Sequence, residues 1–169
     1  GKPADKPIES STLDDALTTS PAGFTTDGKT MYWIDSRGRN TAALFAQDVA
    51  TGQRRLVAQN DRADIGGVLT NPRTGVVEAY SFNYLKPEWT ALDPVIGQSL
   101  DWLEHQLKAS PTIQARTDDD SKWVVSADPV VSPASVYLFD RAAGTLTKIY
   151  TGREQLIGAP LQPMWPVEI

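Results

Sequence analysis

The chain has 169 residues, of which 40% are hydrophobic and 22% charged, a composition that argues against a disordered chain. The formal net charge is −5 and no stretch is rich in Lys or Arg, so nucleic acid is not an expected partner. The chain contains no cysteine and no apolar stretch of about 20 residues, which excludes disulfides and thiolate metal sites, argues against a membrane span, and leaves the compartment open between cytoplasm and periplasm.

The first structural unit is expected over residues 20–60. A turn containing Asp-Gly at 26–29 leads into an apolar run at 31–34, and a polar loop at 36–40 separates this run from a second one at 42–47. Apolar runs rich in aromatic and β-branched residues, with turns between them, are typical of antiparallel strands joined by hairpins. The unit is therefore predicted to be a small antiparallel sheet.

The second unit, over residues 61–110, is a weaker copy that departs from the pattern after Asp93. Asp93 followed by Pro94 is typical of the cap and first turn of a helix. The residues that then fall on one helical face are Ile96, Leu100, Leu103 and Leu107. These features predict an inserted helix over about 94–109, ended by the Ser-Pro pair at 110–111 and standing where a fourth strand is expected.

The third unit, over residues 111–157, repeats the first without a gap. Asp27 and Asp119 are 92 positions apart, and so are Asp48 and Asp140. Half of this spacing is close to the period of about 40–45 residues that propeller blades leave in a sequence. The prediction is an all-β chain, a partial β-propeller of three four-stranded blades with one inserted helix. A sandwich of regular hairpins is the alternative.

Three blades are too few to close a propeller, which needs about four to eight. Residues 1–19 are expected to be a leader or the end of a preceding blade, and residues 158–169 a linker. The outer faces of the first and last units are expected to expose apolar surface. Such surface favours either further chain or association with another copy of this chain.

The residues that most resemble a serine hydrolase site do not complete one. A nucleophile elbow has the form Gly-x-Ser-x-Gly, and the nearest string, at 97–101, lacks the second glycine and falls in the predicted helix. The only histidine, His105, lies four residues after Asp101, where an exposed helical pair is expected rather than a catalytic base. No catalytic residue is assigned from the sequence.

Metal and cofactor sites are not predicted either. Asp118, Asp119 and Asp120 offer oxygen ligands in principle, but the spacing of a calcium loop is missing and a hairpin turn is the preferred interpretation. A pair of carboxylates for hydrolysis stays open as a third possibility, because such pairs meet only in space.

The loop between the two apolar runs of the first unit carries Arg37, Arg39 and Asn40. A loop between two blade strands lies on one rim of a propeller, and rim loops often carry function. Two solvated arginines in a turn are the preferred interpretation, with a contact to a substrate or partner as the alternative.

Residues 20–169 resemble the propeller domain of the prolyl oligopeptidase family of serine peptidases, of the dipeptidyl or acylaminoacyl peptidase type. The resemblance rests on Asp35-Ser36-Arg37-Gly38-Arg39-Asn40-Thr41-Ala42-Ala43-Leu44, Ala63-Asp64-Ile65, Glu88-Trp89, Leu92-Asp93-Pro94, Arg116-Thr117-Asp118-Asp119-Asp120 and Pro163-Met164-Trp165-Pro166-Val167-Glu168-Ile169. The chain departs from the family at Asn40, where an aspartate is expected.

The resemblance implies a role without catalysis. In this family a propeller covers an α/β-hydrolase domain and limits access to small peptides. The chain would then be the last three blades, the segment 158–169 would lead toward a missing hydrolase domain, and the Ser-Asp-His triad would lie beyond Ile169. The implied partners are that domain, the remaining blades and the peptide substrates of the parent, with self-association of the fragment also open. The alternative is a propeller-like scaffold for protein interactions that stands alone.

Overall fold

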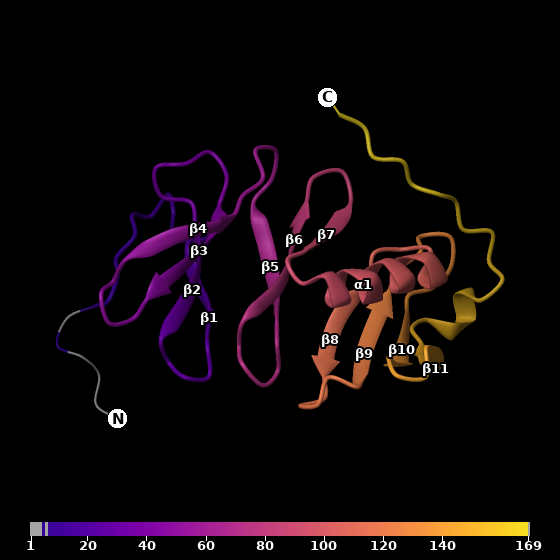
Figure 1. Cartoon of the computed structure of the whole chain (residues 1–169). Coiled ribbons are helices and arrows are strands. Elements are labelled where there is room, and N and C mark those ends of the chain that lie inside the picture. The colour runs from indigo at the N-terminus through magenta and orange to yellow at the C-terminus, as the bar shows by residue number, and fades with distance from the viewer. Residues whose placement is uncertain (1–4, 6, 169) are drawn as a thin grey trace.

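The computed structural model describes residues 5 and 7–168, and in this part of the chain eleven strands form three antiparallel sheets placed side by side (Figure 1). The strands are β1 (Ser20–Phe24), β2 (Thr30–Asp35), β3 (Ala43–Asp48), β4 (Arg54–Ala58), β5 (Ile65–Thr70), β6 (Val77–Asn83), β7 (Pro87–Ala91), β8 (Thr112–Arg116), β9 (Lys122–Ala127), β10 (Ser135–Asp140) and β11 (Thr145–Thr151). A helix, α1 (Pro94–Leu107), follows β7, and a short 3-10 helix, η1 (Glu154–Leu156), follows β11. The predicted mostly β chain with one helix is confirmed.

The first and third sheets are four-stranded meanders, which we call the first and third blades. Their orders are β1-β2-β3-β4 and β8-β9-β10-β11, so each strand pairs with its neighbours in sequence. In the first blade, Trp33 of β2 pairs with Phe45 of β3 on one face, while Tyr32 and Leu44 of the alternating positions belong to the core shared with the second sheet. Each blade therefore has two faces that can pack against a neighbour.

The middle blade has three strands, β5-β6-β7, where four were expected. Two residues after β7, Asp93 caps α1, because its carboxylate accepts hydrogen bonds from the backbone N–H groups of Val95 at 2.8 Å and Ile96 at 3.1 Å. Pro94 occupies the first helical position. The chain therefore enters a helix before it can return along the sheet edge, and α1 replaces the fourth strand.

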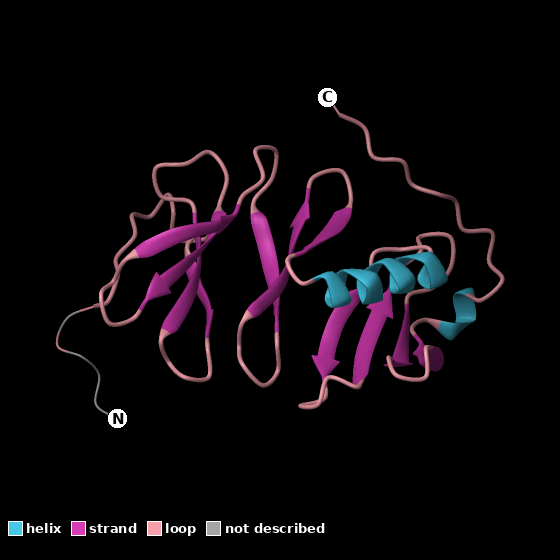
Figure 2. Ribbon diagram, in the orientation of Figure 1, coloured by secondary structure: helices cyan, strands magenta, loops and turns pink. Residues whose placement is uncertain are grey.

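Helix α1 lies beside the strands of the third blade (Figure 2), and its apolar side chains share a core with that blade. The four apolar residues predicted to lie on one face are all buried: Ile96, Leu100, Leu103 and Leu107. They share a core with Trp123 and Phe139 of the third blade. Within the described ranges, no helix is long and apolar enough to cross a membrane.

The helix ends at Leu107, two residues before the predicted end. Lys108 adopts a left-handed conformation, with φ of 53°, and its N–H donates to the carbonyl of Glu104 at 2.8 Å. This bond closes the last turn, so the Ser-Pro pair at 110–111 follows a helix that has already ended.

The turns that reveal the repeat have the same hydrogen bonds in the first and third blades. The Thr25 hydroxyl donates to Asp27 at 2.7 Å, and Asp27 accepts from the backbone N–H of Lys29 at 3.0 Å. Ninety-two positions later, the Thr117 hydroxyl donates to Asp119 at 2.6 Å, and Asp119 accepts from the N–H of Ser121 at 3.1 Å. The spacing of 92 positions therefore separates two turns of the same structure.

Main-chain groups join the first and middle blades. The N–H of Thr26 donates to the carbonyl of Thr74 at 2.9 Å. Beside this bond, Gly75 has a φ of +69°, and a Cβ there would lie 2.2 Å from the carbonyl oxygen of Phe24. A glycine is thus required for these two segments of the chain to approach each other this closely. At the other end of the sheets, the N–H of Ile65 donates to the carbonyl of Ala42 at 2.9 Å.

Candidate functional site

The predicted rim loop lies between β2 and β3, and its first arginine is turned against the first blade. Arg37 takes part in a group of four charged residues that we call the first-blade cluster: Glu9, Asp35, Arg37 and Arg54. Asp35 accepts from Arg37 Nη2 at 2.5 Å and from Arg54 Nη1 at 2.7 Å. Glu9 accepts from the same two arginines, at 2.8 Å and 2.7 Å. Each arginine therefore bridges the same two carboxylates.

The first-blade cluster holds its charges in place. Hydrogen bonds from Arg37, together with its charge and that of Arg54, outweigh burial and lower the pKa of Asp35 to about 2. Hydrogen bonds to Asp35 and Glu9 in turn raise the pKa of Arg37. Because the Asp35 side chain is only 8% exposed, its charge depends on both arginines. This geometry suits a structural role for Arg37.

The other two residues of the loop have different surroundings. The Arg39 Nη2 atom donates to the Gln59 side chain at 2.5 Å, and its guanidinium carbon lies 5.7 Å from the centre of the Phe45 ring. Asn40 is exposed. The three side chains thus have separate environments, and a contact of this loop with a substrate stays a prediction.

The outer face of the first blade is covered only in part. Met31 and Trp33 are buried, and residues 8–11 line a cavity together with them. The guanidinium of Arg54 stacks on the Trp33 ring, 4.8 Å from its centre. On the third blade, by contrast, Ile149 and Tyr150 are 54% and 56% exposed. The first blade is not fully covered either, because Leu56 of its last strand, β4, is 46% exposed.

A second charged group joins the middle and third blades, and we call it the inter-blade cluster: Glu78, Arg116, Asp120 and Arg141. Arg116 Nη1 donates to Glu78 of β6 at 2.8 Å, and Arg116 Nε donates to Asp120 at 2.5 Å. Arg141, which follows β10, forms an ion pair with Asp120. The cluster therefore connects one strand of the middle blade with two turns of the third blade.

Trp123 lies at the centre of the inter-blade cluster. The guanidinium carbons of Arg116 and Arg141 lie 4.8 Å and 4.9 Å from the centre of its ring, and its indole N–H donates to Asp120 at 2.7 Å. Burial acts to lower the pKa of Arg116, but hydrogen bonds to Asp120 and Glu78 outweigh it and the pKa is raised. Arg116 therefore stays charged although its side chain is only 5% exposed.

The sequence did not single out the inter-blade cluster, although one signal was present. Arg116 lies 92 positions after Phe24, so the repeat places an arginine where the first unit has an aromatic residue. Such an exchange indicates a polar partner in the neighbouring blade. The partner, Glu78, lies 38 positions away and has no local pattern that marks it.

The three consecutive aspartates, Asp118 to Asp120, do not direct their side chains to a common site. Asp119 forms the turn before β9, where hydrogen bonds from the Thr117 hydroxyl and from Ser121 lower its pKa to about 2. Asp120 points into the inter-blade cluster, while Asp118 accepts from Arg73 through its backbone carbonyl at 2.9 Å. In residues 5 and 7–168, no group of three or more His, Asp or Glu side chains is placed to hold a metal ion.

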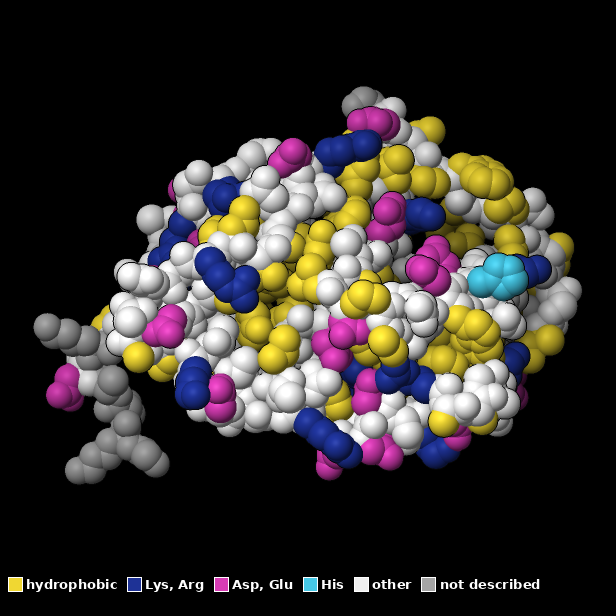
Figure 3. Space-filling model, viewed as in Figure 1, with side chains coloured by type: hydrophobic (Ala, Val, Ile, Leu, Met, Phe, Trp, Pro, Cys, Tyr) yellow, Lys and Arg dark blue, Asp and Glu magenta, His cyan; other side chains and the backbone are white. Residues whose placement is uncertain are grey.

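The residues nearest to a hydrolase pattern lie on α1. The Ser99 hydroxyl donates to the carbonyl of Val95 at 3.2 Å and accepts from Arg141 Nε at 3.2 Å. His105, the cyan side chain in Figure 3, lies on the surface, and among the described residues no hydrogen bond or ion pair connects it with Asp101. The expected helical pair is therefore not formed.

The last residues of the chain lie along one rim. Residues 158–168 run from the third blade back toward the middle blade (Figure 1). Glu168 accepts a hydrogen bond from the Tyr84 hydroxyl, and it lies 3.7 Å from a guanidinium nitrogen of Arg62. Between these ends, Met164 and Trp165 are 76% and 80% exposed. Figure 3 shows apolar side chains gathered on the surface along this part of the chain.

Comparisons with known proteins fit this architecture. No family model matches the chain. The chain is 52% identical over 157 residues to "Dipeptidyl aminopeptidase BIII" of Pseudoxanthomonas mexicana, covering 93% of this chain and 23% of that protein. It is 28% identical over 130 residues to "Dipeptidyl peptidase family member 6" of Caenorhabditis elegans, covering 76% of this chain and 18% of that protein. The chain thus spans about a fifth of the length of these two relatives.

A solved structure supports the fold alone. TolB from Acinetobacter baumannii superposes with a TM-score of 0.53 at 20% sequence identity, over 79% of this chain and 33% of that one. This likeness confirms the propeller-like arrangement of blades. The names of the two curated relatives agree with the peptidase resemblance drawn from the sequence.

Proposed function

We propose that this chain, a homologue of a segment of dipeptidyl peptidases, is a non-catalytic propeller segment of a serine peptidase of the prolyl oligopeptidase family. Its role would be to limit access of peptides to an α/β-hydrolase domain and to dock on that domain. The observation that carries the proposal is the 52% identity over 93% of the chain to a protein of which this alignment covers only 23%. Neighbouring blades that share apolar cores, as these do, are suited to form the wall of an access channel.

The rim formed by residues 158–168 supports the docking part of the proposal. Met164, Trp165 and Val167 are each more than three-quarters exposed, yet Glu168 is tied to Tyr84 and Arg62 of the middle blade. Large apolar side chains held at the surface are typical of an interface. We expect the hydrolase domain to cover this rim.

The first test uses the 169-residue chain alone. Incubated with dipeptidyl-p-nitroanilides, it is expected to release no more p-nitroaniline than buffer does. Release that increases in proportion to the concentration of the chain would show that the segment carries its own catalytic site, and the proposal would be wrong.

The second test examines access in the full-length peptidase. Arg116→Met weakens the inter-blade cluster, and we expect casein cleavage to rise several-fold while the kcat/KM for a dipeptidyl-p-nitroanilide changes little. Arg55→Met, at an exposed position of β4, is the matched control and should alter neither activity. If casein cleavage stays unchanged in a folded Arg116→Met protein, the blades do not control access.

A further inference from the structure

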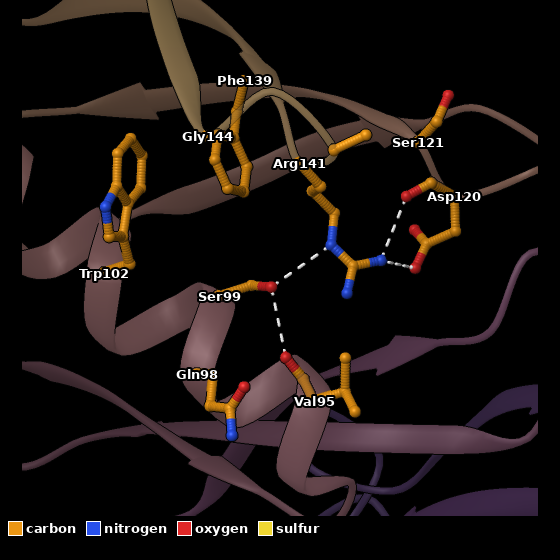
Figure 4. A pocket seen from close by; sticks show the side chains of 10 residues that line it. Val95, Gln98, Ser99, Trp102, Asp120, Ser121, Phe139, Arg141 and Gly144 are labelled. Atoms are coloured by element: carbon orange, nitrogen blue, oxygen red, sulfur yellow. Dashed lines mark hydrogen bonds and ion pairs between the residues drawn. The ribbon is translucent and has the colours of Figure 1, made fainter.

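A cavity of about 480 Å³ lies between the first half of α1 and the ends of β9 and β10. We call it the helix pocket and define it by Val95, Ser99, Trp102, Asp120, Phe139 and Arg141, which line it (Figure 4). Its volume lies within the range of pockets that hold a small ligand or a peptide side chain with its flanking groups.

One wall of the helix pocket is aromatic and fixed. The rings of Trp102 and Phe139 are stacked, with centres 4.9 Å apart and planes inclined by 17°. The rings of Phe139 and Trp123 form a T-shaped pair with centres 5.8 Å apart, so the wall rests on the fully buried Trp123 of the third blade. A wall supported in this way can accept an apolar group without rearranging.

The opposite end of the helix pocket offers a positioned donor. Arg141 Nη1 donates to the Asp120 carbonyl at 3.0 Å and also pairs with the Asp120 carboxylate, while Arg141 Nε donates to the Ser99 hydroxyl at 3.2 Å. Figure 4 shows these contacts, and in the described part of the chain no partner is recorded for the third nitrogen, Nη2. The guanidinium is therefore held by α1 and by the β8–β9 turn, and both N–H bonds of its Nη2 atom remain open.

The charges around the helix pocket favour a neutral ligand. The carboxylate of Asp120 lies directly beside Arg141 and compensates its positive charge. A ligand carboxylate at Arg141 Nη2 would face the negative charge of Asp120, whereas a neutral carbonyl oxygen would accept the hydrogen bond without this repulsion. The pocket thus combines an aromatic wall with a donor for a neutral acceptor.

We propose that the helix pocket binds a peptide segment, with a large apolar side chain against Trp102 and Phe139 and the neighbouring peptide carbonyl on Arg141. The polar Gln98 and Ser121 also line the pocket and can meet further peptide groups. This binding goes beyond the proposed peptidase role, because it requires neither the hydrolase domain nor a closed ring.

The test is an NMR titration of the 169-residue chain with N-acetyl-L-phenylalaninamide. We expect saturable shifts of the amide signals of Ser99 and Ser121 and of the Trp102 indole, with a dissociation constant in the millimolar range. N-acetylglycinamide, which lacks the apolar side chain, should produce no saturable shift there. N-acetyl-L-phenylalanine, which carries a carboxylate, should bind several-fold more weakly. Tighter binding of the carboxylate, or equal shifts with the glycine probe, would overturn the proposal.

Two variants separate the two parts of the pocket. Trp102→Leu keeps an apolar side chain but removes the aromatic stack, and we expect about a tenfold loss of affinity. Arg141→Lys keeps the positive charge but removes the planar guanidinium with its fixed N–H directions, and we expect a smaller loss of affinity than for Trp102→Leu. Gln106→Ala, on the exposed side of α1, is the control. Unchanged binding by a Trp102→Leu protein whose other signals keep their positions would show that the probe binds elsewhere.

Discussion

The two interfaces between neighbouring blades differ in the polar groups that join them. The first and middle blades share an apolar core that includes Tyr32 and Ile65, and they also meet through main-chain hydrogen bonds at Thr26 and Ile65 and through the close approach at Gly75. The middle and third blades meet through side chains, namely the apolar face of α1, the Trp123 ring and the inter-blade cluster. Both interfaces bury apolar side chains, but the polar contacts of the first come from the backbone and those of the second from charged side chains.

The largest effect is expected at the interface between the middle and third blades. Trp123 is fully buried, and Trp123→Ala should lower the free energy of unfolding by about 4 to 5 kcal/mol, because it leaves a cavity and removes the ring on which Arg116 and Arg141 stack. Chemical denaturation measures the loss. Trp165→Ala, at a residue that is 80% exposed, is the control and should change little. Equal effects of the two substitutions would contradict the described core.

Removal of one charge from the inter-blade cluster should have the next largest effect. Arg116→Met leaves Glu78 and Asp120 without their shared partner, and we expect a loss of about 3 to 4 kcal/mol. Arg55→Met, at an exposed arginine, should cost less than about 0.5 kcal/mol. A loss as small as that of the control would mean that the cluster does not hold the two blades together.

The interface between the first and middle blades should be sensitive to a single methyl group. Gly75→Ala places a Cβ 2.2 Å from the Phe24 carbonyl oxygen at a positive φ, and we expect a loss of about 3 kcal/mol. Gly28→Ala has a similar φ, +70°, but no atom within 4 Å, so it should cost only about 1 kcal/mol. The difference between the two unfolding curves isolates the contact between blades. No difference would show that the blades separate freely at this point.

A charged group outside both interfaces provides the smallest effect. The folded-state pKa of Asp35 is about 2, below its ordinary value of 3.8, so its charged form stabilises the fold above about pH 4. This contribution, about 2 kcal/mol, should disappear as the pH falls from about 4 to about 2. Asp35→Asn should therefore destabilise the chain at pH 7 and flatten the acid limb of the stability curve.

The control for Asp35 is Asp61→Asn, at an exposed residue without an ion pair among the described residues. Its acid unfolding should follow that of the unchanged chain. If Asp35→Asn also leaves the acid limb as it is, the first-blade cluster contributes no proton-linked stability.

Local features of the sequence predicted much of this fold. Asp93 and Pro94 are adjacent in sequence, and the buried face of α1 recurs every three or four residues, so both could be read directly. The turns at Asp27 and Asp119 could be predicted because their hydrogen bonds join residues at most five positions apart. The start of α1 at Pro94 has the same local cause, but the number of strands in the middle blade depends on where the chain turns back.

The features missed by the sequence join distant positions. Arg37 meets Glu9 across 28 positions, and Arg116 meets Glu78 across 38. An arginine in a loop has the same local signature whether it faces water or a buried carboxylate, so Arg37 could be placed on the loop but its partners could not be named. The helix pocket likewise needs Ser99 and Arg141, 42 positions apart, to be brought together by the packing of α1.

The helix at the end of the middle blade also affects which parts of the molecule can recruit further strands. β4 and β11 are outermost strands with one row of backbone groups unpaired within their sheets, and an extended peptide can add to such an edge. In the middle blade the last element is α1, which satisfies its backbone groups internally and packs close to Ala91 of β7 through Gly97. Because α1 packs close to β7, the outermost strand of the middle blade, sheet extension in assembly or in aggregation is expected more readily at β4 and β11 than at β7.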